Sequence, residues 1–125
     1  MTKEIIYIFI GGGIGSALRY LVQVVLHERI VPYNFPWATL VVNLLGSFLI
    51  GLFYALSERF HFSSEVRLFL TAGLCGGFTT FSTFSNDGLA LLKDGFYGTF
   101  IMYTLISVGI GIIAVVAGGY VGKQL

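Results

Sequence analysis

Long apolar runs dominate the chain. Four segments of about 20 or more mainly apolar residues stand out, at about residues 5–26, 37–56, 68–92 and 96–121. A helix of about 20 residues crosses the hydrocarbon core of a bilayer. The second and fourth segments contain no charged residue, and only Arg19 carries a charge within the first. The pattern predicts an all-α membrane protein with four transmembrane helices in a single integral-membrane domain.

The third segment differs from the others in its glycines and hydroxyl groups. Gly73, Gly76 and Gly77 fall in its middle, and residues 78–85 read Phe-Thr-Thr-Phe-Ser-Thr-Phe-Ser. Glycine weakens a helix, and clustered hydroxyls offer other partners to the backbone groups that are freed. We therefore predict a helix broken near residues 76–80, close to the bilayer midplane. At that depth, non-helical backbone must be buried in protein or line a cavity.

Glycines also recur at helix-packing spacing elsewhere in the chain. Gly11 with Gly15 and Gly118 with Gly122 are four residues apart in the first and fourth segments. Small residues at this spacing let transmembrane helices approach closely, so we interpret both pairs as packing contacts. The same interpretation is the alternative for the glycines of the third segment.

Polar and aromatic side chains recur at helical spacing in three of the segments. They are Thr39, Asn43 and Ser47 in the second, Tyr103 and Ser107 in the fourth, and Thr80, Phe81, Thr83, Phe84 and Asp87 in the third. An asparagine at mid-span is costly to bury and needs a partner. Three such stripes indicate a polar pathway. Hydroxyl and amide donors suit an anion, and a phenyl edge is weakly electropositive, although ordinary packing is the alternative for the phenylalanines. Asp87 is expected to cap, or to pair with Arg19 or a hydroxyl.

Composition narrows the class of protein. Of 125 residues, 56% are hydrophobic and 10% charged, and the mean hydropathy is +0.89. A soluble domain carries about 25% charged residues, so this class is excluded. The net charge of +1 argues against nucleic-acid binding through a basic surface. One cysteine excludes an intrachain disulfide framework. The sequence shows no nucleophile–base pair or cluster of metal ligands that would indicate an enzyme.

The charges outside the segments orient the chain only weakly. With four spans, both termini and the second connection share one side of the membrane, and the first and third connections share the other. The first side holds Lys3, Arg59, Arg67 and Lys123, and the second holds Arg29 and Lys93. This small positive-inside bias fits insertion with both termini inside. It also permits insertion both ways round, as antiparallel homodimers.

Residues 73–85, Gly-Leu-Cys-Gly-Gly-Phe-Thr-Thr-Phe-Ser-Thr-Phe-Ser, resemble the signature of the Fluc (CrcB-type) fluoride channel family. Residues 12–19 and 39–46 also match, and the likeness covers essentially the whole chain. It implies a passive, fluoride-selective channel in the cell's inner membrane that exports cytoplasmic fluoride. It also implies an antiparallel, dual-topology homodimer with two pores.

The resemblance further implies roles for individual residues. Phe81 and Phe84 would turn their ring edges toward fluoride, Asn43 would donate its amide, Ser82 and Thr83 would supply a polar track, Tyr103 and Ser107 would lie near the path, and Arg19 would stand in the vestibule. The backbone carbonyls of Gly76 and Thr79, from both subunits, would hold a structural sodium ion at the dimer centre. Asp87 stands where family members often carry the longer glutamate, which changes its reach.

Two other functions fit a small apolar protein of this kind. A dual-topology secondary exporter would need an acidic residue in the first span to couple protons, and that span holds Arg19 instead. A membrane scaffold assembled through small-residue faces would leave the three polar stripes unexplained. The sequence therefore favours the channel.

Overall fold

The computed structural model describes residues 1–29 and 35–125, and every regular element in these two ranges is helical. In chain order these are α1 (Thr2–Arg29), α2 (Trp37–Arg59), α3 (Ser64–Leu68), the π-helix η1 (Phe69–Cys75), α4 (Gly76–Phe78), α5 (Phe81–Lys93) and α6 (Tyr97–Gln124). The middle of the predicted first connection, residues 30–34, lies outside the described part of the chain. The all-helical prediction is confirmed.

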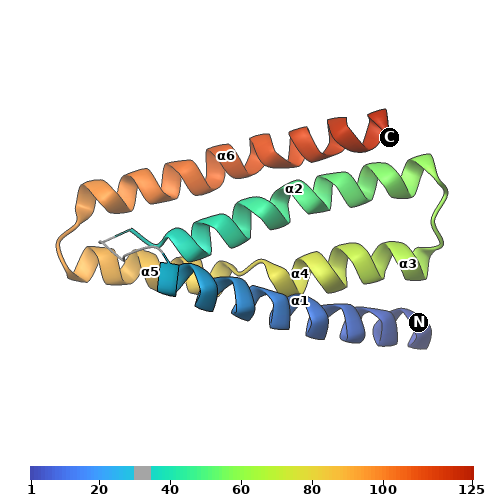
Figure 1. The fold of residues 1–125 in the computed structure, drawn as a ribbon, viewed down its shortest axis with the longest axis horizontal. Coiled ribbons are helices and arrows are strands. Elements are labelled where there is room, and N and C mark those ends of the chain that lie inside the picture. Colours follow the sequence, from blue (N-terminus) through green and yellow to red (C-terminus); the bar gives the residue numbers. More distant parts are fainter. Residues whose placement is uncertain (30–34) are drawn as a thin grey trace.

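The chain makes four passes along one long axis (Figure 1). Helices α1, α2 and α6 are long and apolar enough to cross a bilayer, and α3, η1, α4 and α5 together make the remaining pass. Both termini lie at the same end of the molecule as the α2–α3 turn, as expected for an even number of passes (Figure 1). The protein is therefore built as a membrane protein with three uninterrupted apolar helices and one interrupted pass.

The interruption predicted near residues 76–80 is confirmed. Helix α4 ends at Phe78, and α5 begins at Phe81. Between them, Thr79 (φ −85°, ψ 160°) and Thr80 (φ −151°, ψ 114°) are extended. The π-helical turns of η1 just before the break were not predicted. The pass thus consists of two half-helices joined by a two-residue extended linker.

Glycines bring two pairs of helices into backbone contact, α1 with η1 and α6 with α2. A Cβ atom on Gly15 of α1 would fall on the Leu74 carbonyl oxygen of η1. A Cβ atom on Gly118 of α6 would fall on the Phe48 carbonyl oxygen of α2. The packing interpretation of the glycine pairs in α1 and α6 is therefore confirmed. Gly77 serves the same purpose, since its Cβ would strike the Gly12 carbonyl oxygen.

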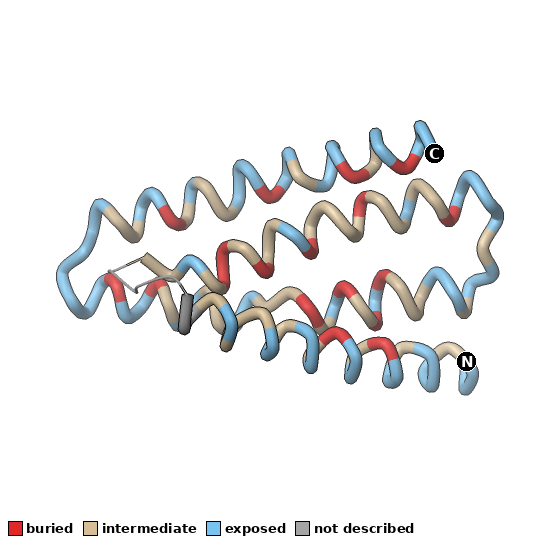
Figure 2. The backbone as a smooth tube through the Cα atoms, in the orientation of Figure 1, coloured by how far each residue is buried: buried red, intermediate tan, exposed pale blue. Residues whose placement is uncertain are grey.

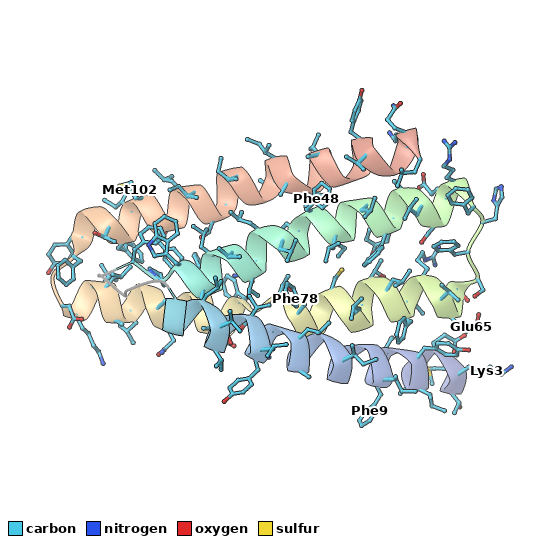
Figure 3. All side chains as sticks on the ribbon, in the orientation of Figure 1. Lys3, Phe9, Phe48, Glu65, Phe78 and Met102 are labelled. Atoms are coloured by element: carbon cyan, nitrogen blue, oxygen red, sulfur yellow. The ribbon has the colours of Figure 1, made fainter. Side chains whose placement is uncertain are left out.

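The buried residues lie along the inner faces of the helices, and the outer faces are exposed (Figure 2). Many of the exposed side chains are large and apolar. Phe78 points into the space between the interrupted pass and α2 and is only 6% exposed, whereas Phe9 and Met102 point outward (Figure 3). Leu40, Leu91 and Tyr103 form a buried cluster that joins α2, α5 and α6. Apolar outer faces of this kind suit contact with lipid or with another membrane protein.

We expect Gly15→Ala to lower the free energy of unfolding in detergent micelles by about 1–3 kcal/mol, because the new methyl group overpacks the contact with the Leu74 carbonyl. Gly13→Ala is the matched control, since a Cβ there would meet no atom of a neighbouring helix within 4 Å. The control should change that free energy by less than about 1 kcal/mol. Equal losses in both variants would contradict close packing at Gly15.

Candidate ion pathway at the interrupted helix

Asn43 on α2 pairs with the backbone of Thr80 at the break. Its Nδ2 donates to the Thr80 carbonyl at 3.1 Å, and the Thr80 N–H donates to Asn43 Oδ1 at 2.8 Å. The carboxamide thus matches both polar groups of one residue in extended conformation. An unpaired peptide group in an apolar layer would cost several kcal/mol. The partner expected for an asparagine at mid-span is therefore the linker itself.

The hydroxyls of the linker serve the ends of the two half-helices. Thr80 Oγ1 accepts the Thr83 N–H at 3.1 Å and so caps the N-terminus of α5. The same oxygen lies 3.0 Å from Thr83 Oγ1 and 3.3 Å from Ser82 Oγ. On the other side of the break, Thr79 Oγ1 donates to the Cys75 carbonyl at 3.0 Å. The hydroxyl run predicted to support a break does so.

Two side chains from α1 reach the carbonyl of Gly77, at the end of the first half-helix. Arg19 Nε donates to it at 3.0 Å, and Ser16 Oγ donates at 3.4 Å. The sequence singled out Arg19 for a vestibule, and it did not single out Ser16. The structure places both donors at the break.

The break also frees the two carbonyls predicted to bind sodium. In a continuous helix, the N–H of Thr80 would donate to the Gly76 carbonyl, and that of Thr83 to the Thr79 carbonyl. Here the first donates to Asn43 and the second to Thr80 Oγ1. Both carbonyls therefore lack their helical donors. Oxygen ligands of this type suit a hard cation, so the donor set fits the sodium ion.

A recess of about 350 Å³ opens beside the linker. The described residues that line it are Asn43, Gly46, Ser47, Ile50, Cys75, Gly76, Thr79, Thr80, Phe81, Phe84, Ser107 and Val108. It therefore brings together Asn43, both phenylalanines and Ser107 from the predicted pore set, as well as both predicted carbonyl residues. Ser82, Thr83 and Tyr103 stand outside the lining.

Aromatic rings continue from the recess toward the start of α2. The ring centroids of Phe81 and Phe84 are 5.8 Å apart, and those of Phe84 and Tyr103 are 5.0 Å apart. Phe35 then meets Tyr103 edge-on at 5.6 Å. The fully buried Tyr103 donates its hydroxyl to Asp87 Oδ2 at 3.3 Å. Of the partners expected for Asp87, the structure selects a hydroxyl.

A family model described as "CrcB-like protein, Camphor Resistance (CrcB)" matches residues 6–119. The chain belongs to the CrcB-like family. A Bacteroides fragilis protein named fluoride-specific ion channel FluC is 62% identical over 124 residues, which cover 98% of each chain. A protein of the same name from Phocaeicola vulgatus is 53% identical over 93% of this chain and 95% of its own. Another from Leptospira interrogans is 46% identical over 98% of this chain and 97% of its own. The resemblance seen in residues 73–85 is confirmed.

The chemistry of the recess is that of a neutral, weakly polar path. Its described lining offers amide, hydroxyl, backbone and phenyl groups and no carboxylate or ammonium group. Ser107 Oγ is buried there without a hydrogen-bond partner in the described structure. Phe81 is 79% exposed on the single chain. Such a surface can replace part of an ion's water shell without holding the ion tightly.

Three residues that contribute to the site were not predicted from the sequence. Ser16 lies one helical turn before Arg19, a spacing that could have indicated a shared target. Gly46 is small because Thr79 packs against it: a Cβ there would strike the Thr79 side-chain methyl. Phe35 precedes the second apolar run and carried no signal of its contact with Tyr103.

We expect Asn43→Ala to lower the free energy of unfolding in micelles by about 1–3 kcal/mol, because it leaves the N–H and C=O of Thr80 unpaired in an apolar setting. Ser47→Ala, one turn along the same face of α2, is the control and should change that free energy by less than about 1 kcal/mol. Indistinguishable stabilities would show that the linker does not depend on Asn43.

Proposed function

We propose that this chain forms a passive, fluoride-selective channel that lets fluoride leave the cytoplasm. The observation that carries the proposal is the recess at the broken helix, where Asn43, Phe81, Phe84 and Ser107 converge. The names of the relatives support the same function, since each is called a fluoride-specific ion channel. Between Glu4 and Glu28, α1 carries no carboxylate, which disfavours the proton-coupled exporter.

The recess residues act on fluoride by replacing water. Fluoride is strongly hydrated, so a selective path needs donors that compensate for lost water and still release the ion. The second Nδ2 hydrogen of Asn43 and the hydroxyl of Ser107 would be such donors within the recess. The hydroxyls of Ser82 and Thr83, which lie outside its lining, would continue the polar track. The ring edges of Phe81 and Phe84 add a weak positive potential. No step requires a nucleotide, a proton gradient or a covalent intermediate.

Two copies of the chain in antiparallel orientation would complete the channel. Phe81 and Gly76 lie at the recess and are exposed on the single chain, and a second copy would cover them. The positive residues of the sequence, four on one side against Arg29 and Lys93 on the other, impose little orientation. A homodimer of this kind would have two recesses and so two pores. We place it in the cell's inner membrane.

A structural sodium ion would sit where the two copies meet. The carbonyls of Gly76 and Thr79, freed by the break, would hold it from each copy. Its chemistry is electrostatic: it would neutralise the partial negative charge of carbonyls that end the first half-helix. The residues of the chain keep this arrangement in place through the Asn43–Thr80 pair and the Thr80 cap.

We expect liposomes that contain the purified protein to release fluoride when a potassium ionophore sets an outward driving voltage, because a passive channel needs only that voltage. Chloride release should stay at the level of protein-free liposomes. A fluoride electrode and a chloride electrode measure the two rates. Fluoride release that occurs only with a proton gradient would identify an exporter. If neither ion is released, the protein would instead be the non-transporting membrane scaffold.

Phe81→Ile should reduce the rate of fluoride release at least about tenfold, equivalent to a loss of about 1.4 kcal/mol, because isoleucine lacks the electropositive ring edge. Phe9→Ile on the outer face of α1 is the matched control, since Phe9 and Phe81 are 80% and 79% exposed. The control should retain the original rate. Equal rates in the two variants would remove Phe81 from the path.

A further inference from the structure

The carbonyl oxygen of Gly77 is the point where α1 holds the end of the first half-helix. Arg19 Nε and Ser16 Oγ both donate to it, at 3.0 Å and 3.4 Å. The two donors lie three residues apart on one face of α1, and Gly77 lies against the backbone of Gly12. Contact between the glycines thus brings this carbonyl within reach of both side chains.

This carbonyl needs a donor more than most backbone groups do. It belongs to the last turn before the break, where the Phe81 N–H would have served it in a continuous helix. The negative end of a helix dipole lies there, which favours a cationic donor. Charge-assisted hydrogen bonds are about twice as strong as neutral ones. Arg19 is therefore the stronger of the two partners.

The atom that Arg19 uses separates this contact from a simple attraction of anions. The bond to Gly77 is made by Nε, the nitrogen next to the aliphatic stem, so the two terminal nitrogens are not part of it. A glutamine side chain places its amide nitrogen the same number of bonds from Cα as Arg Nε. A lysine keeps the charge but carries its nitrogen one bond further out.

We propose that Arg19 is a positioning residue: with Ser16 it fixes the Gly77 carbonyl through the donor at its Nε, and thereby sets the geometry of the break. The consequence for transport rests on the proposed channel function. The consequence for the backbone does not, and it can be measured without any ion flux.

Three variants of Arg19 separate the bond from the charge. Arg19→Gln keeps a donor at the position of Nε and removes the charge, Arg19→Lys keeps the charge and displaces the donor, and Arg19→Met removes both. Hydrogen–deuterium exchange of residues 76–84 in micelles reports the break directly, and fluoride release from liposomes reports its effect on transport. Arg67→Gln, at an exposed position in α3, controls for loss of a positive charge.

We expect exchange at the break to rise about tenfold in Arg19→Met, the factor that corresponds to loss of one hydrogen bond. It should rise less than about threefold in Arg19→Gln and lie between these values in Arg19→Lys. Fluoride release should be fastest in the original protein, slower in Arg19→Gln, slower again in Arg19→Lys and slowest in Arg19→Met. Adding Ser16→Ala should matter more in the Met background than in the original protein, because Ser16 is then the only donor.

The proposal is overturned if exchange and fluoride release in Arg19→Lys match those of the original protein while Arg19→Gln is as impaired as Arg19→Met. Arg19 would then act through its charge alone. Equal exchange in all three variants would also overturn it. If the Arg19→Met variant does not fold, the comparison of Arg19→Gln with Arg19→Lys still tests the proposal. A chain that releases no fluoride but shows the expected order of exchange would contradict the channel and support the positioning role.

Discussion

Peptide groups freed inside an apolar layer must find partners, and this requirement organises the whole molecule. Breaking one pass at Thr79 and Thr80 removes helical hydrogen bonds, and inside a bilayer water does not replace such bonds. The chain supplies substitutes from three directions: α2 gives the Asn43 carboxamide, α1 gives Arg19 and Ser16, and the linker gives its own threonine hydroxyl. Helices α1 and α2 therefore each carry at least one polar side chain that bonds the backbone of the break.

Close packing and the polar site depend on each other. The donors of α1 reach Gly77 only because backbone meets backbone at Gly12 and Gly15, and Asn43 reaches Thr80 on a helix whose Gly46 leaves room for the Thr79 methyl group. Side chains larger than glycine there would separate the helices and leave the break unpaired. The recess forms where the half-helices part, so its lining combines a group that the backbone uses, the Asn43 carboxamide, with one that it leaves free, the Ser107 hydroxyl.

The sequence predicted the helical class, the four passes and the position of the break, because apolar length and clustered glycines and hydroxyls are local signals. It also selected Asn43, Phe81, Phe84 and Ser107, which the structure places around one recess. It did not predict the π-helical turns of η1, nor that Asn43 and Arg19 contact the backbone of the break. Those features depend on how helices far apart in sequence lie against each other, and a spacing pattern on one helix does not contain that information. The role of each recess residue toward fluoride stays a prediction.

The pair formed by Asp87 and Tyr103 shows how one shortened side chain bears on the proposed path. A carboxylate near an anion's route repels the anion, and a hydrogen bond from a neutral donor weakens this repulsion; Tyr103 is the donor in contact with Asp87. Bonds from a hydroxyl to a carboxylate are usually about 2.5–2.7 Å long, whereas this one is 3.3 Å. A glutamate at this position would reach one bond further, so the aspartate holds the phenol loosely. Because Tyr103 packs on Phe84 at a centroid distance of 5.0 Å, the position of this phenol is coupled to one of the two rings that are predicted to face the ion.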